Sequence, residues 1–124
     1  MQNLLLVFIG GGLGSVSRYG ISQLFLTHFN SRLSPTYATI TSNVIATFAL
    51  AVVWLMIDTG KLPQNLKYLV IVGFCGGFST FSTFSFETFQ FIRQGLWLPA
   101  ILNVLVSVAL CLVVVYLVLR PTSG

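Results

Sequence analysis

The chain has 124 residues, a length that alone would permit one small soluble domain with a modest core. Its composition excludes that class, because only 6% of the residues are charged, where soluble domains average roughly a quarter. Hydrophobic residues make up 56% of the chain and the mean hydropathy is +0.94, so we expect lipid to surround most of it. The six Lys and Arg residues stand singly rather than in a patch, which argues against a nucleic-acid partner.

Four apolar stretches lie between short separators that are polar or contain Pro or Gly. They cover about residues 3–29, 35–57, 67–92 and 97–119, and each is of the order of the roughly 20 residues that cross a bilayer as a helix. None alternates apolar and polar residues as the strands of a membrane β-barrel do. The sequence therefore predicts an all-α integral membrane protein, with residues 1–124 forming one domain of four transmembrane helices.

The Lys and Arg residues give little bias toward either orientation in the membrane. With four spans, three of these basic residues lie on one side of the membrane and two or three on the other. The two sets are Lys61, Lys67 and Arg120, and Arg32, Arg93 and, if its side chain reaches the nearer helix end, Arg18. This balance permits insertion in both orientations and assembly as an antiparallel dimer. The alternative is a single orientation fixed by a small bias.

Three polar residues lie inside the predicted spans, where an unpaired charge or amide costs several kcal/mol and marks a candidate functional site. They are Arg18, Asn43 and Glu87. Arg18 and Glu87 could also lie near the membrane edge or pair with one another. Asn43 is near the centre of its span, and its amide has several hydrogen-bonding positions to satisfy, which favours a functional role.

Small and polar residues recur at steps of four on every predicted span, which places each series on one helix face. The four series are Gly10-Gly14-Arg18, Thr39-Asn43-Thr47, Ser79-Thr83-Glu87 and Asn103-Ser107-Cys111. Such stripes also pack helices in membranes, because small residues let two backbones approach and polar groups bond across the interface. Packing is the better interpretation for Gly10 and Gly14. For Thr47 and Asn103 the two interpretations stay open.

The third span contains a segment that predicts an interrupted helix, Gly73-Phe-Cys-Gly-Gly-Phe-Ser-Thr-Phe-Ser-Thr-Phe-Ser-Phe-Glu87. Two consecutive glycines followed by hydroxyl residues form a weak helix, so we expect a break in mid-membrane near residues 76–80. A break frees carbonyl and amide groups that must line a cavity or hold an ion. Phe78, Phe81 and Phe84 recur at steps of three and predict a ladder of rings just beyond the break. Packing or lipid contact is the simpler explanation of the rings alone.

This segment resembles the Fluc fluoride channels, the CrcB family, as do residues 10–19 (Gly-Gly-Gly-Leu-Gly-Ser-Val-Ser-Arg-Tyr) and 39–43 (Thr-Ile-Thr-Ser-Asn). The resemblance extends from the first span to the fourth. It implies a channel in the inner membrane of a prokaryote that passes fluoride out of the cytoplasm by passive diffusion. It also implies an antiparallel homodimer with two pores.

The resemblance implies roles for particular residues. Family members hold a sodium ion at the dimer centre through backbone carbonyls, which map here to Gly76 and Ser79. The phenylalanines that line the fluoride path map to Phe81 and Phe84, and the pore asparagine maps to Asn43. Other polar positions near the pore or its vestibules are Arg18, Thr39, Ser82, Thr83, Glu87 and, on the fourth helix, Ser107.

These residue types suit a small, tightly hydrated anion, because neutral donors can replace its water without holding it too strongly. The edge of a phenyl ring is electropositive and can stabilise an anion, while a central cation and Arg18 add favourable field. Two positions depart from the family pattern. Ala38 stands where Gly commonly precedes Thr39, which is expected to tighten packing, and Ser107 is followed at steps of four by Cys111 and Val115.

Two other classes share the size and the helix count. A small four-helix multidrug or cation exporter needs a carboxylate early in the first span, but the acids of this chain are Asp58 and Glu87. A structural subunit of a larger membrane complex needs neither Asn43 nor an interrupted helix. The chain's one histidine, His28, lies in a separator and no nucleophile–base pair is evident, so we do not expect an enzyme.

Overall fold

The computed structural model describes residues 1–29, 31 and 33–120. In this part of the chain every regular element is helical, and four segments are long and apolar enough to cross a membrane. They are Gln2–His28, Ser34–Asp58, Lys67–Arg93 and Trp97–Leu119. The prediction of an all-helical, multi-pass membrane protein is confirmed at this level. Arg32, which entered the charge balance, lies outside the described residues.

The first two helices are α1 (Gln2–His28) and α2 (Ser34–Asp58), and the fourth span is α5 (Trp97–Leu119). Pro35 stands in the first turn of α2, where a missing backbone N–H costs nothing. Ser34 is buried and its hydroxyl donates a hydrogen bond to the carbonyl of Phe29, which ties the start of α2 to the end of α1. Gly60 and Gly95 have positive φ values of 79° and 77°, which suit the turns after α2 and before α5.

The third span consists of three consecutive pieces. Residues Lys67–Cys75 form a π-helical segment, η1, followed by the short helix α3 (Gly76–Phe78) and by α4 (Phe81–Arg93). The two residues between α3 and α4 are extended, Ser79 with φ −85° and ψ 158° and Thr80 with φ −153° and ψ 120°. The glycine pair is therefore helical, and the extended backbone falls on the two hydroxyl residues that follow it.

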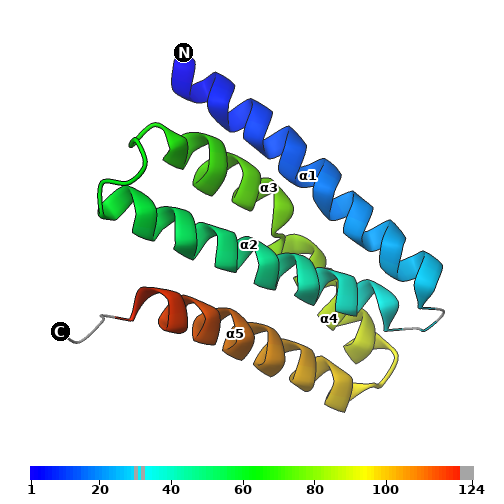
Figure 1. Cartoon of the computed structure of the whole chain (residues 1–124). Helices are drawn as coiled ribbons and strands as arrows, with labels where there is room; N and C mark the ends of the chain where they lie inside the picture. The colour runs from blue at the N-terminus through cyan, green and yellow to red at the C-terminus, as the bar shows by residue number, and fades with distance from the viewer. Residues whose placement is uncertain (30, 32, 121–124) are drawn as a thin grey trace.

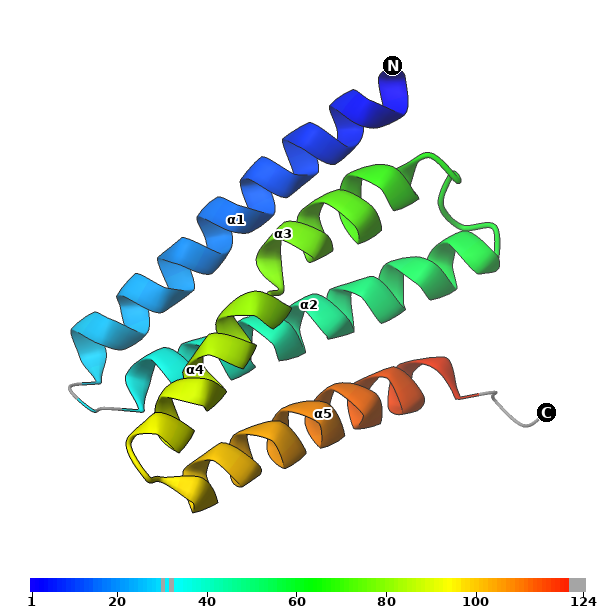
Figure 2. The ribbon, with the colours of Figure 1, turned by 180° about the vertical axis from the view of Figure 1, so that it is seen from behind.

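The interruption moves the third span from one side of the bundle to the other. Its first part, η1 and α3, packs on α1, while α4 packs on α5; α2 contacts α1, α5 and all three pieces of the third span. Figures 1 and 2 show α1 and α5 at opposite edges, with α2 and the third span between them. Helix α2 is thus the central element of the fold.

Backbone contact between α1 and the third span depends on glycine. A Cβ at Gly10 would lie 2.9 Å from the amide nitrogen of Phe74, and a Cβ at Gly14 would lie 2.8 Å from that of Phe78. At Gly77, an added Cβ would fall on the backbone of Gly11. The packing interpretation of Gly10 and Gly14 is confirmed, because these positions leave no room for any side chain.

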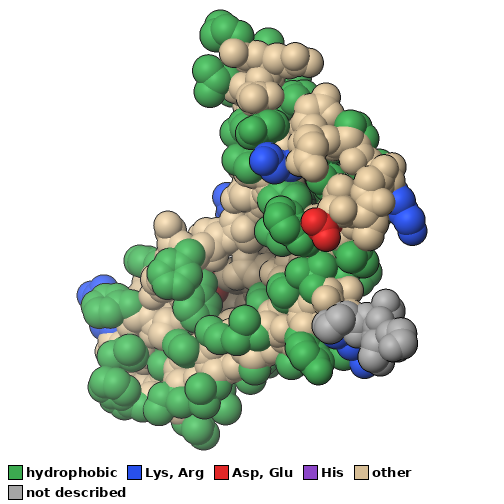
Figure 3. Space-filling model, turned by 90° about the vertical axis from the view of Figure 1, so that its left-hand side faces the viewer, with side chains coloured by type: hydrophobic (Ala, Val, Ile, Leu, Met, Phe, Trp, Pro, Cys, Tyr) green, Lys and Arg blue, Asp and Glu red, His purple; other side chains and the backbone are tan. Residues whose placement is uncertain are grey.

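The interior of the single chain is small, and its exterior is apolar. Buried residues concentrate on α2, where Ala38, Ala46 and Ala51 are each at most 2% exposed. Large apolar side chains are exposed along every span, for example Phe8 at 80% and Leu112 at 64%. On the face shown in Figure 3, hydrophobic side chains predominate and charged ones are few and separate. This surface suits lipid contact or contact with another subunit.

Candidate functional site: a groove at the interrupted third span

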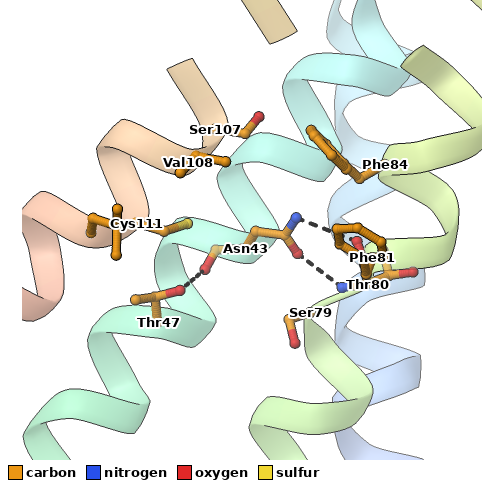
Figure 4. A pocket seen from close by; sticks show the side chains of 10 residues that line it. Asn43, Thr47, Ser79, Thr80, Phe81, Phe84, Ser107, Val108 and Cys111 are labelled. Atoms are coloured by element: carbon orange, nitrogen blue, oxygen red, sulfur yellow. Dashed lines mark hydrogen bonds between the residues drawn. The ribbon is translucent and has the colours of Figure 1, made fainter. Parts of the chain in front are cut away.

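A groove of about 350 Å³ opens beside the interruption, between α2, α4 and α5. Its walls carry Asn43 and Thr47 from α2, Ser79, Thr80, Phe81 and Phe84 from the third span, and Ser107 and Cys111 from α5. Figure 4 shows Asn43 directed from α2 across the groove toward the extended residues. Four residues with a predicted pore role, Asn43, Phe81, Phe84 and Ser107, thus line one groove together with Ser79.

Asn43 and Thr80 form a reciprocal pair of hydrogen bonds across the groove. The Thr80 amide donates to Asn43 Oδ1 at 2.9 Å, and Asn43 Nδ2 donates to the Thr80 carbonyl oxygen at 3.4 Å (Figure 4). Thr47 Oγ1 donates to the backbone carbonyl of Asn43 at 2.7 Å. The Asn43 amide therefore replaces the helical partners that the extended backbone of Thr80 has lost, which holds the interruption in a fixed geometry.

The interruption leaves particular carbonyl groups without helical donors. In a continuous helix the Thr80 amide would bond to the Gly76 carbonyl, and the Thr83 amide to the Ser79 carbonyl. Here the Thr80 amide donates to Asn43, and the Thr83 amide donates to Thr80 Oγ1 at 3.2 Å. The carbonyls of Gly76 and Ser79 are therefore available to another donor or to a cation.

Thr80 also caps the start of α4. Its hydroxyl accepts from the Thr83 amide and donates to Thr83 Oγ1 at 3.1 Å, in the arrangement of a helix N-cap. The N-terminus of a 13-residue helix thus begins in the wall of the groove. Because the N-terminal end of a helix carries partial positive charge, this wall favours an anion over a cation.

Phe81 and Phe84 lie together on the groove side of α4. Their ring centroids are 5.7 Å apart with an interplanar angle of 38°, and Phe81 is 79% exposed in the single chain. The prediction that Phe78 continues this ladder is wrong. Phe78 is only 4% exposed and stacks on Phe74 at 5.5 Å, because the extended Ser79 and Thr80 separate its helical register from that of α4.

Arg18 lies against the third span at the end of α3. Its Nε donates to the Gly77 carbonyl oxygen at 3.3 Å, which is the carbonyl that Phe81 would bond in a continuous helix. A positive charge is favourable at the C-terminal end of a helix, where unpaired carbonyls gather. The structure thus places Arg18 at the interruption, and its Nε contact is with backbone rather than with Glu87.

Glu87 lies one turn beyond the groove and contacts α2. Thr39 Oγ1 donates to Glu87 Oε1 at 2.7 Å and also lies 3.0 Å from the Pro35 carbonyl oxygen. Glu87 Oε2 is buried and makes no hydrogen bond within the described part of the chain. Glu87 also borders a second, wider cavity of about 1030 Å³ near the α4–α5 turn, together with Thr36, Gln90 and Gln94.

The remaining predicted residues lie away from the groove in the single chain. Thr39 is buried beneath Glu87, Thr83 is engaged with Thr80, and Ser82 is exposed on α4. Gly76 is exposed on the third span as well. Exposure of Ser82 and Gly76 leaves both accessible to a second subunit. The pore roles of these residues stay predictions.

Two groups of contacts were not predicted from the sequence. Thr80 is the direct partner of Asn43, and the pattern of a hydroxyl residue three positions before Thr83 could have indicated its capping role. Thr88 on α4 accepts a hydrogen bond from Asn103 on α5 at 2.8 Å. No spacing rule links residues on two different helices, so this pair could not be found before the helices were placed.

Comparison with known proteins shows similarity over nearly the whole chain. Residues 5–119 match the family described as CrcB-like protein, Camphor Resistance (CrcB). A protein of a Shewanella species named "Fluoride-specific ion channel FluC" is 43% identical over 117 residues, which are 94% of this chain and 93% of that protein. Proteins of the same name from Shewanella putrefaciens and Shewanella denitrificans are 43% and 40% identical over the same shares.

Proposed function

The chain belongs to the CrcB-like protein family, and from this membership and the groove at the interrupted third span we propose that it is a fluoride-specific ion channel. The observation that carries the proposal is the convergence of Asn43, Phe81 and Phe84 on one groove whose wall contains the N-terminus of α4. The protein is a channel and not an enzyme. It works in the inner membrane of a prokaryote, an assignment that its bacterial relatives support.

The groove can replace the water around a fluoride ion without trapping it. The donors at its wall are neutral, namely the Asn43 amide and backbone N–H groups at the start of α4. The electropositive edges of Phe81 and Phe84 add an attraction that falls off with anion size. An inside-negative potential drives an anion outward by about 2.3 kcal/mol per 100 mV, so export needs no other energy source.

A paired efflux measurement tests this function. Liposomes that contain the purified protein are loaded with fluoride or with chloride, and release is followed with an ion-specific electrode. We expect rapid release of fluoride and no release of chloride above that of empty vesicles. Fluoride release equal to that of empty vesicles, or comparable release of both anions, would show that the chain is not a fluoride-specific channel.

Replacing Phe81 or Phe84 with isoleucine is expected to abolish fluoride efflux while the protein still assembles. Isoleucine fills most of the space of the ring but has no electropositive edge, so only the attraction for the anion is lost. The matched control is Phe89→Ile, because Phe89 is on α4, 57% exposed and outside the groove. Efflux is measured for all three variants. Normal rates in the Phe81 and Phe84 variants would remove the ring edges from the mechanism.

The working unit of the proposal is an antiparallel homodimer with two pores, formed by chains inserted in both orientations. Exposed Phe81 and Gly76 support this, because a second chain would cover residues that the single chain leaves open. The near balance of Lys and Arg between the two sides supports it also. A C-terminal tag that a membrane-impermeant reagent labels on both faces of the membrane is the expected result; labelling on one face alone contradicts dual topology.

The interruption of the third span is expected to lie in mid-membrane, and we propose that its free carbonyls hold a structural sodium ion at the dimer centre. Hard cations prefer oxygen ligands, and the Gly76 and Ser79 carbonyls lack their helical donors. The ion would neutralise the carbonyl end of α3 and add favourable field for a passing anion. Replacing sodium with a larger cation is expected to lower fluoride efflux only slowly, over repeated dialysis. Immediate, graded dependence on external sodium would instead indicate a cation that moves with fluoride.

A further inference from the structure

A chain of side-chain hydrogen bonds joins α4 to α5 beside the groove. Asn103 Nδ2 donates to Thr88 Oγ1 at 2.8 Å, and Thr88 Oγ1 donates to the Phe84 carbonyl oxygen at 2.8 Å. At the other end, Ser107 Oγ lies 3.4 Å from Asn103 Oδ1 and donates to it. We call this series, Phe84–Thr88–Asn103–Ser107, the α4–α5 bridge. Its two ends, Phe84 and Ser107, line the groove, and its centre does not.

Each group in the α4–α5 bridge has its direction fixed by its neighbour. The Thr88 hydroxyl has one proton, which it gives to the Phe84 carbonyl, so it can only accept from Asn103. This requires the NH2 group of Asn103 to face α4 and its oxygen to face Ser107. The amide therefore connects two groove residues through bonds of a defined order.

Asn103 is well suited to hold this arrangement, because it is buried and its amide has few other hydrogen-bond partners. It is 4% exposed, and it lies with Ala100 and Ser107 on the buried face of α5. Inside a membrane no water replaces a broken hydrogen bond, so the amide keeps its protein partners. The turn between α4 and α5 is only three residues long, so the helices stay adjacent without the α4–α5 bridge. What the α4–α5 bridge adds is a fixed rotational orientation of α4 relative to α5.

We propose that Asn103 is a positioning residue for ion permeation, which acts through Thr88 and Ser107 to hold Phe84 and Ser107 in register across the groove. The inference rests on the proposed function. Phe84 is on α4 and lines the groove, so a rotation of α4 about its axis would move the Phe84 ring edge out of the path. Selectivity for fluoride thus depends on a residue that does not itself contact the ion.

The test compares Asn103→Leu and Thr88→Val, each close to its parent in size but unable to form the α4–α5 bridge. Fluoride efflux is expected to fall by about tenfold, because losing one buried hydrogen bond changes a rate by about that factor. Chloride efflux is expected to rise. The double variant is expected to be no worse than either single one, because both break the same connection. The exchanged pair Asn103→Thr with Thr88→Asn restores an amide–hydroxyl bond and is expected to recover selectivity. Val104→Leu, on the more exposed side of α5, is the control.

Unchanged efflux and selectivity in Asn103→Leu would overturn the inference, and so would additive losses in the double variant. If Asn103→Leu does not assemble, the smaller change Thr88→Val decides; failure of both to assemble would make the residue structural only, which also overturns the proposal. Absence of fluoride efflux from the unaltered protein is a different result, since it removes the proposed function rather than the role of Asn103.

Discussion

Gly14→Ala is expected to prevent α1 from packing on the third span, with loss of most folded protein. The new Cβ would overlap the Phe74 carbonyl oxygen and lie 3.0 Å from its carbonyl carbon and 2.8 Å from the Phe78 nitrogen. The Phe78 nitrogen is directly before the interruption, and Phe74 is one helical turn earlier, so a shift of this backbone would displace Ser79 and Thr80. We expect a loss of about 3 kcal/mol, the upper end for overpacking. Thermal unfolding and gel filtration in detergent measure it.

The matched control is Gly12→Ala, two residues away on the same helix. A Cβ at Gly12 meets nothing within 4 Å, and alanine favours a helix over glycine by about 0.5–1 kcal/mol. We therefore expect Gly12→Ala to fold at least as well as the unaltered protein. Equal stability of the two variants would contradict the backbone contact between α1 and the third span.

Asn43→Asp is expected to abolish fluoride conduction while the protein still folds. The change is almost isosteric, and the Thr80 amide can still donate to an oxygen at this position. A negative charge about 4 Å from a passing anion costs about 4 kcal/mol at an effective dielectric constant of about 20. That corresponds to a fall in flux of about a thousandfold. Fluoride efflux from liposomes measures the effect.

Asn65→Asp provides the control for the change of charge. Asn65 is exposed in the turn after α2, away from the groove, so the same substitution there is expected to leave efflux unchanged. Conduction by Asn43→Asp at the unaltered rate would exclude Asn43 from the fluoride path. Loss of conduction in both variants would point to net charge rather than position.

The sequence was sufficient to predict the helices and the face of α1 that packs. Composition and run length indicate four spans, and the step of four places Gly10, Gly14 and Arg18 on one face, which the structure directs at the third span. The partner of Arg18 could not be predicted. Its acceptor is the Gly77 carbonyl, which is free only because the extended backbone begins two residues later.

Phe78 shows why periodicity fails at an interruption. A step of three predicts aligned rings only while the backbone stays helical, and the extended Ser79 and Thr80 end that relation. Phe78 therefore packs with Phe74 in the interior, and Phe81 and Phe84 face the groove. The groove brings α2 together with α4 and α5, which come much later in the chain, so a family motif could suggest its residues but spacing along the chain could not.

The proposed channel is tested most directly by the reversal potential of its current in a planar bilayer. With chloride equal on both sides and a tenfold gradient of fluoride, we expect the current to reverse at about 59 mV, the equilibrium potential for a monovalent ion. Because conduction is passive, the shift should hold without any proton or sodium gradient. Reversal at zero, or at a potential that follows an imposed chloride gradient, would contradict a fluoride-specific path through this groove.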